Sequence, residues 1–119
     1  MRRLLILVVG VVLAAAPALA EGPGRYAVSG AGPNGHDPYK GTATLSRSGD
    51  GTWSIRWKIG KDAYTGTGVG DGRVLAISFS GAGTRGTILF NANPDGSYAG
   101  VWAYTSGRGL GTESLVPSP

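Results

Sequence analysis

The sequence predicts an all-β domain, a small antiparallel up-and-down barrel of about eight strands, and three observations predict it. Apolar and polar residues alternate with a period of two along short segments, which places one set on each face of a strand. Aspartate–glycine pairs and other short turns separate these segments, as tight hairpins require. No window after residue 20 has the apolar spacing of a helix. A two-sheet β-sandwich is the alternative architecture.

Four strands are expected before residue 70. Arg25–Gly30 is a weak candidate, and Tyr39–Arg47 follows the alternation loosely. Thr52–Ile59 is the clearest strand in the chain, because four large apolar residues alternate with polar ones. The turn Asp50-Gly51 precedes it, and glycine accepts the positive φ of such a hairpin. Ala63–Val69 completes the group as another weak candidate.

Four more strands follow. Arg73–Phe79 alternates clearly, Thr84–Asn91 and Ser97–Thr105 alternate loosely, and Leu110–Val116 is a weak candidate. Every connection except Ala31–Pro38 is too short for a crossover, so neighbours in sequence should be antiparallel neighbours in space. Short strands at a regular spacing favour an up-and-down barrel.

Large aromatic rings are expected to fill this barrel. Trp53 and Trp57 lie on one face of their strand and Arg56 and Lys58 on the other, so both tryptophans should be core anchors. Several strands carry a ring and a glycine on the same face, and we expect rings of one strand to cover glycines of the next. The candidate core residues, which would line a ligand site if the interior stayed open, are Trp53, Trp57, Trp102, Tyr64 and Tyr98.

The first twenty residues are typical of a secretory signal peptide. Leu4–Leu13 is apolar but shorter than the ~20 residues that span a bilayer, and Ala18 and Ala20 suit a signal peptidase. We therefore expect residues 1–20 to be a signal peptide and residues 21–119 a single barrel domain. The protein would be exported, periplasmic or secreted, without a stable membrane anchor after cleavage.

The composition argues against catalysis and against cofactors. The chain has no cysteine and one histidine, which leaves no disulfide and no histidine/cysteine set for zinc. His36 and Asp37 are sequence neighbours, a poor arrangement for a catalytic triad. Glu113 is the one acidic residue expected inside a strand. We expect it to pair with Arg25 or Arg108 on an adjacent strand, and a functional acid is the alternative. No enzyme, no metal site and no cofactor is predicted.

Nucleic-acid binding is not expected either. Without Arg2 and Arg3 the net charge falls from +4 to +2, which is too little for a basic patch. A Gly-x-Gly-x-x-Gly match at residues 81–86 precedes a further strand, whereas a dinucleotide site requires a helix there.

Short motifs along residues 24–113 resemble a known family. They are Gly24-Arg25-Tyr26-x-Val28-x-Gly30, Tyr39-x-Gly41, Gly49-Asp50, Trp57-x-Ile59-Gly60, Tyr64-Thr65-Gly66-Thr67-Gly68, Leu75-Ala76-x-x-Phe79, Asp95-Gly96-x-x-x-Gly100-x-Trp102 and Gly111-Thr112-Glu113. The chain resembles a family of small exported proteobacterial β-barrel proteins, mostly hypothetical, some of which carry the label fibronectin-binding protein. The resemblance implies no catalytic or binding residues. The architecture is also similar to avidin-like and lipocalin-like barrels, without a clear biotin-binding residue set.

Three function classes remain. Because the rings are expected to fill the interior, a non-catalytic protein-interaction module, adhesive or inhibitory, is favoured. A small-ligand-binding barrel and a structural envelope protein are the alternatives. An empty volume of ~300–1,000 Å³ inside the barrel would favour the ligand-binding alternative. The candidate interaction site is the longest connection, Ala31–Pro38, with Asn34, His36, Asp37 and the adjacent Tyr39.

Overall fold

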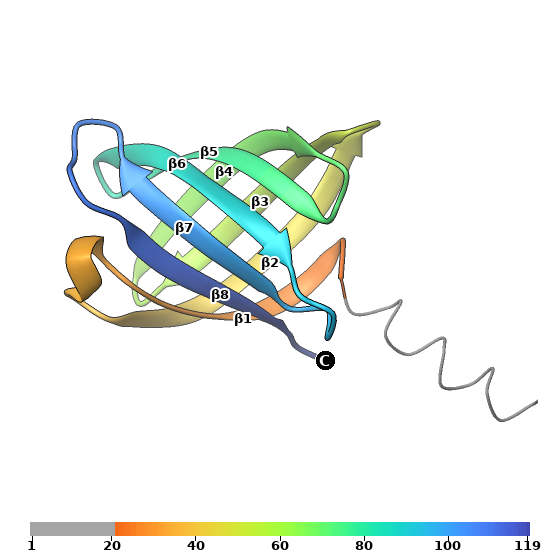
Figure 1. The fold of residues 1–119 in the computed structure, drawn as a ribbon, viewed down its shortest axis with the longest axis horizontal. Coiled ribbons are helices and arrows are strands. Elements are labelled where there is room, and N and C mark those ends of the chain that lie inside the picture. The colour runs from red at the N-terminus through yellow and green to blue at the C-terminus, as the bar shows by residue number, and fades with distance from the viewer. Residues whose placement is uncertain (1–20) are drawn as a thin grey trace, which may run out of the picture.

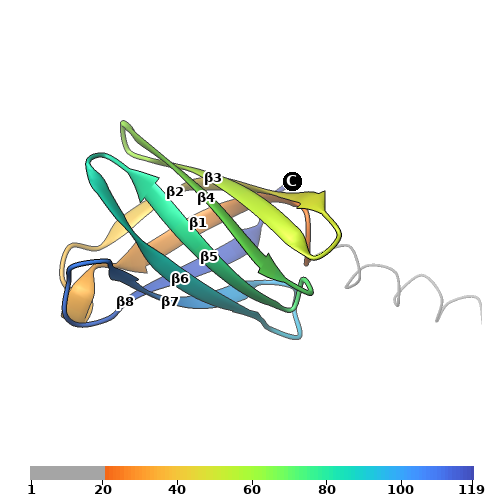
Figure 2. The same cartoon turned by 90° about the horizontal axis from the view of Figure 1, so that it is seen from above.

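Eight antiparallel strands close into a barrel in the order in which they follow one another in the chain (Figures 1 and 2). The structure is a computed structural model, and it describes residues 21–119; the predicted signal peptide lies outside the described residues. The strands are β1 (Gly24–Ala31), β2 (Tyr39–Gly49), β3 (Thr52–Ile59), β4 (Asp62–Gly70), β5 (Val74–Gly81), β6 (Thr84–Ala92), β7 (Tyr98–Tyr104) and β8 (Gly111–Pro117), with a short 3₁₀ turn η1 (Pro33–Gly35).

The strand register confirms the predicted barrel. Each strand pairs with its sequence neighbours, and β1 also pairs with β8, from Tyr26 opposite Pro117 to Ala31 opposite Thr112. One closed sheet results, so the alternative two-sheet sandwich is wrong. All eight strands lie within two residues of their predicted bounds. The turn η1 was not predicted, because it is too short to show a helical spacing.

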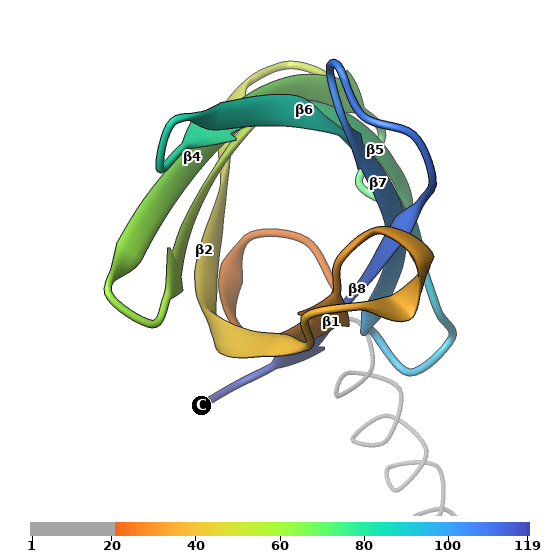
Figure 3. The same ribbon diagram turned by 90° about the vertical axis from the view of Figure 1, so that its left-hand side faces the viewer.

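The two ends of the barrel differ. The β1–β2, β3–β4, β5–β6 and β7–β8 connections meet at one end, which we call the mouth. The other three hairpins, residues 21–23 and the C-terminus meet at the opposite end, which we call the base (Figure 1). The view into the mouth shows η1 at its rim (Figure 3).

Aromatic side chains seal the base. Trp53 and Tyr98 are fully buried there, and the Trp53 Nε1 group donates to the Gly70 carbonyl at 3.0 Å. The Tyr98 hydroxyl donates to the Gly72 carbonyl at 2.6 Å and accepts from the Gly22 N–H at 3.0 Å. The segment that precedes β1 is therefore part of the seal, and these two rings close the base off from solvent.

Rings packed over glycines let the strands curve. A Cβ atom on Gly100 would lie 2.8 Å from two carbons of the Phe90 ring, and one on Gly86 would lie 2.7 Å from the Phe79 ring. Each of these glycines stands directly opposite its ring in the strand register. This confirms the expectation that rings of one strand cover glycines of the next.

Gly100→Ala is expected to lower the free energy of unfolding by roughly 1–3 kcal/mol, because the added methyl group forces the buried Phe90 ring to shift. The neighbouring Ala99 points outward and is exposed, so Ala99→Ser should stay within about 0.5 kcal/mol of the wild type. Urea unfolding of both variants checks this. Equal stability of the two would contradict the ring-over-glycine packing.

Candidate ligand cavity at the barrel mouth

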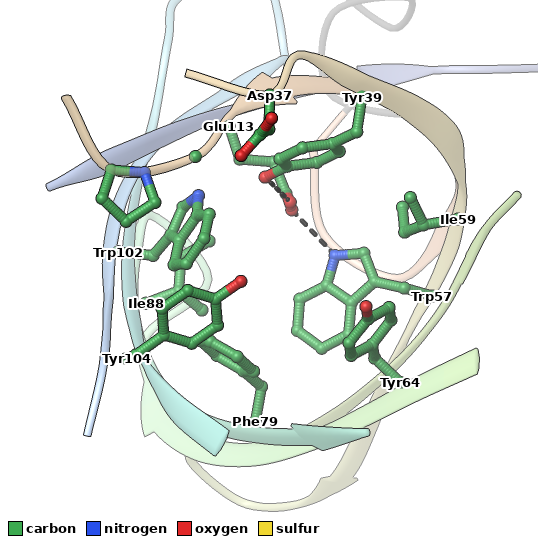
Figure 4. Close-up of a pocket in the computed structure, with 12 residues that line it drawn as sticks. Asp37, Tyr39, Trp57, Ile59, Tyr64, Phe79, Ile88, Trp102, Tyr104 and Glu113 are labelled. Carbon is green, nitrogen blue, oxygen red and sulfur yellow. Dashed lines mark hydrogen bonds between the residues drawn. The ribbon is translucent and has the colours of Figure 1, made fainter. Parts of the chain in front are cut away.

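A cavity of about 290 Å³ opens at the mouth of the barrel. Residues from strands β2 to β8 and from the β1–β2 loop surround it (Figure 4). The lining residues are Gly32, Pro33, Asp37, Tyr39, Trp57, Ile59, Tyr64, Phe79, Ile88, Trp102, Tyr104 and Glu113. We call this space the mouth cavity.

Strand alternation and glycines together create the space. In β3, the residues in phase with the buried Trp53 include Trp57 and Ile59, so these two also point inward, but at the mouth end. In β8, Glu113 stands opposite Gly30 of β1 on one side and opposite Gly100 of β7 on the other. Because both paired residues are glycines, no Cβ atom of a neighbouring strand lies directly beside the Glu113 side chain on the inner face of the sheet.

Edge-to-face ring contacts form the aromatic wall. The Trp102 ring lies 5.9 Å from the Phe79 ring and 5.0 Å from the Tyr104 ring, both near perpendicular. Phe79 in turn contacts Trp57 at 6.2 Å. Edge-to-face pairs of this kind stabilise one another by about 0.5–1.5 kcal/mol each, so the wall is a preformed surface.

The carboxyl group of Glu113 is the only buried acid in the described part of the chain. Its two oxygens accept hydrogen bonds from the Trp57 Nε1 group and the Tyr39 hydroxyl, both at 2.8 Å (Figure 4). Burial raises the pKa of Glu113 to about 7, although these two hydrogen bonds favour the ionised form. Burial and the neighbouring Glu113 also raise the pKa of Tyr39, which is therefore neutral at physiological pH.

The expected ion pair of Glu113 with Arg25 or Arg108 is wrong. Its partners are Tyr39 and Trp57, whereas both arginines are exposed. The reason is strand phase: Arg25 alternates with the inward-facing Tyr26 and so points outward, while Glu113 is in phase with the buried Leu115.

The structure divides the candidate interaction loop. Asp37 and Tyr39 line the mouth cavity, but His36 is exposed and does not. The Asn34 N–H group donates to the Leu110 carbonyl at 3.0 Å, which ties the loop to the β7–β8 connection. The loop is therefore part of the rim of the cavity, and its role as a protein-binding surface stays a prediction.

The candidate aromatic residues also separate into two groups. Trp57, Trp102 and Tyr64 line the mouth cavity, whereas Trp53 and Tyr98 belong to the sealed base. The expectation that rings fill the whole interior is thus correct for the base and wrong for the mouth. Sequence reasoning did not assign five of the cavity residues to a site: Ile59, Phe79, Ile88, Tyr104 and Glu113.

Two of the acidic residues in the turns, Asp71 and Asp95, accept hydrogen bonds within their own turns. Asp71 Oδ1 accepts from the N–H groups of Arg73 and Val74 at 2.8 and 3.0 Å, and these bonds lower the pKa of Asp71. Within residues 21–119, no three histidine, aspartate or glutamate side chains gather where they could hold a metal ion. Nor does any helix in that range have the length and apolar character to cross a membrane.

Comparison with known proteins supports the fold. No family model and no curated protein matches the chain. Among solved structures, the chain is similar to a de novo designed fluorescence-activating β-barrel, with a TM-score of 0.64 and 15% sequence identity. The match covers 84% of this chain and 97% of the designed one. At this identity the likeness shows a shared barrel fold alone.

Proposed function

We propose that this protein is a non-catalytic binding protein that holds a small, largely apolar molecule in the mouth cavity. The observation that carries the proposal is the open space of about 290 Å³, lined by six aromatic side chains and closed below by the sealed base. Ligand sites are typically concave and mostly apolar, with a few fixed polar groups.

The dimensions support a compact ligand. Eight-stranded barrels are just wide enough for side chains or one small ligand, and this barrel has both, at opposite ends. Ligand pockets start at ~300 Å³, so the cavity suits a molecule of one or two rings. The designed barrel of similar fold is described as fluorescence-activating, and such an activity is compatible with a small molecule in a barrel of this kind.

The chemistry of the cavity favours binding over catalysis. Glu113 is bonded to two neutral donors, Tyr39 and Trp57, and the lining residues include no histidine, lysine, serine or threonine. General acid–base catalysis needs a proton donor or acceptor placed at the reacting atom. Of the two carboxyl groups that line the cavity, Asp37 lies at the exposed rim and Glu113 is held by its two hydrogen bonds.

We also propose that the protein is exported, because the first twenty residues have the pattern of a signal peptide. The resemblance to exported barrel proteins agrees with that destination. The adhesive or inhibitory module that the sequence favoured becomes the second choice, since it depended on a filled interior.

A titration with three probes tests the proposal. Phenyltrimethylammonium, tert-butylbenzene and benzenesulfonate share one ring and a tetrahedral head group of similar size, and carry charges of +1, 0 and −1. We expect at least one to bind with a Kd that is roughly submillimolar, as suits a ligand of about ten heavy atoms. The readout is the ¹H–¹⁵N spectrum, in which each of the three tryptophans gives its own indole signal.

Binding in the mouth cavity should shift the indole signals of Trp57 and Trp102 and leave that of Trp53 unchanged, since Trp53 lies in the sealed base. Trp53 thus serves as an internal control in the same sample. If none of the three probes moves the Trp57 and Trp102 signals, the proposed function is wrong.

A further inference from the structure

The charge inside the mouth cavity carries an inference that rests on the proposed function and specifies its ligand. We infer that the ligand is a small organic cation, which places an ammonium group beside the Glu113 carboxylate and among the aromatic rings. Two features of the cavity lead to this class of ligand, its charge and its aromatic faces.

The cavity is acidic and holds no compensating positive charge. Asp37 and Glu113 line it, and none of its lining residues within the described chain is lysine, arginine or histidine. The lysines nearest in sequence, Lys40 and Lys58, are exposed and alternate with the inward-facing Tyr39 and Trp57. His36, which precedes Asp37, is also exposed and does not line the cavity. An anionic ligand would therefore meet two carboxyl groups without a partner.

Glu113 has unused capacity to bind a cation. A carboxylate offers about four lone-pair sites, and Glu113 uses one on each oxygen, toward Trp57 and Tyr39. Both donors are neutral, so the buried negative charge lacks a counter-ion. Buried charges in proteins are normally paired, and a ligand cation would supply the missing partner. The carboxyl group points into the cavity, where such a ligand would lie (Figure 4).

The aromatic rings provide the second feature. Six of them surround the cavity: Tyr39, Trp57, Tyr64, Phe79, Trp102 and Tyr104. The faces of such rings carry negative potential and attract cations, tryptophan most strongly, and cages of this type recognise quaternary ammonium groups. A neutral aromatic ligand would use the rings but would leave the Glu113 carboxylate unpaired.

The pH dependence of binding follows from the groups that face the carboxyl. Tyr39 contacts the carboxyl directly, and the other titratable residues that line the cavity with it are Asp37, Tyr64 and Tyr104. The pKa values of Tyr39 and Tyr64 are raised by burial, so these tyrosines do not titrate below pH 8. A cation prefers ionised Glu113, so affinity for it should fall on acidification through pH 7.

The three probes named above test the inference. At pH 8, phenyltrimethylammonium should bind at least about tenfold more tightly than tert-butylbenzene, its neutral isostere, and benzenesulfonate should bind most weakly. Between pH 8 and pH 5 the affinity for the cation should fall by about tenfold or more, while that for tert-butylbenzene should not fall. Shifts of the Trp57 and Trp102 indole signals report each affinity.

Glu113→Gln removes the charge and keeps the shape. The amide oxygen can accept from Trp57 Nε1, and its NH₂ group can donate to the Tyr39 oxygen, because a hydroxyl can reverse its role. This variant should abolish both the cation preference and the pH dependence. Asp37→Asn is the matched control at the exposed rim and should keep most of the preference.

The outcomes separate the two proposals. Equal binding of the neutral and cationic probes, or tightest binding of the anion, overturns the cation inference and leaves the proposed function standing. A cation preference that survives in Glu113→Gln and disappears in Asp37→Asn also overturns it, since the charge would then act at the rim. No binding of any probe overturns both.

Discussion

Trp53→Ala is expected to lower the free energy of unfolding by about 3–5 kcal/mol, because it leaves a sealed void in the base. Trp53 is fully buried, donates a hydrogen bond to Gly70, and is covered by the Arg47 guanidinium group 4.5 Å from its ring centre. Small domains have only ~5–15 kcal/mol of stability, so the variant should lose a large part of its own. At ~4–8 °C per kcal/mol, thermal denaturation should show a drop in Tm of at least about 12 °C.

Trp102→Ala is the matched control at the other end of the barrel. Trp102 lines the mouth cavity, so its truncation enlarges a space that already opens to water, and the stability cost should be clearly smaller. Equal losses for the two variants would show that the mouth is packed like the base, which would contradict the division of the interior.

Glu113 is expected to make the protein less stable as the pH rises. Its pKa is about 7 in the folded state and near 4.5 in the unfolded chain, so the folded state binds the proton more strongly. Its stabilising contribution is therefore fully present below pH 4.5 and is lost as the pH rises through 7. At 1.36 kcal/mol per pKa unit the loss is roughly 3 kcal/mol between pH 4.5 and pH 8. The pKa values of Asp71 and Asp95 are lowered, so their contributions to stability have the opposite pH dependence. These contributions are lost as the pH falls below this range.

Urea unfolding of wild type and Glu113→Gln at pH 4.5 and pH 8 measures this contribution. The variant should match the wild type within about 1 kcal/mol at pH 4.5 and exceed it by roughly 1–3 kcal/mol at pH 8, since it buries no charge. Asp37→Asn should keep the wild-type change in unfolding free energy between the two pH values. If the unfolding free energy of Glu113→Gln changed with pH as much as that of the wild type, the carboxyl group would not be buried as described.

The fold was predictable because one local pattern extends over nearly the whole of residues 21–119. A period of two places Trp53 and Trp57 on one face and Arg56 and Lys58 on the other, and the structure shows that division. Hairpin-length connections then allow little besides sequential antiparallel pairing, which leads to a closed barrel. The Asp-Gly turns between strands are also observed, and the Asp71 and Asp95 carboxylates accept hydrogen bonds from backbone N–H groups of their own turns.

The site was harder to predict, because it depends on position along the barrel axis. Alternation says that Trp53 and Trp57 both point inward, but not that one end is sealed and the other open. The seal depends on Gly22, which precedes the first strand and bonds to Tyr98 across the barrel, 76 residues away in sequence. No local pattern encodes a contact of that kind.

Glu113 could have been placed correctly from the strand phase alone. It alternates in step with Gly111 and Leu115, which face the interior, whereas Arg25 is out of step with Tyr26. The preference for pairing a strand carboxylate with an arginine obscured this signal. For a polar residue in a strand, the phase relative to the apolar face is therefore a better indicator of an interior site than the charge of the side chain.

The most direct test of a ligand site at the mouth is a crystal structure of the protein soaked with phenyltrimethylammonium. We predict electron density for the probe inside the mouth cavity, with its ring against Trp57 and Trp102 and its ammonium group beside Glu113. The base around Trp53 should be unchanged. A cavity filled by protein side chains, or a probe found only on the outer wall of the barrel, would contradict the account.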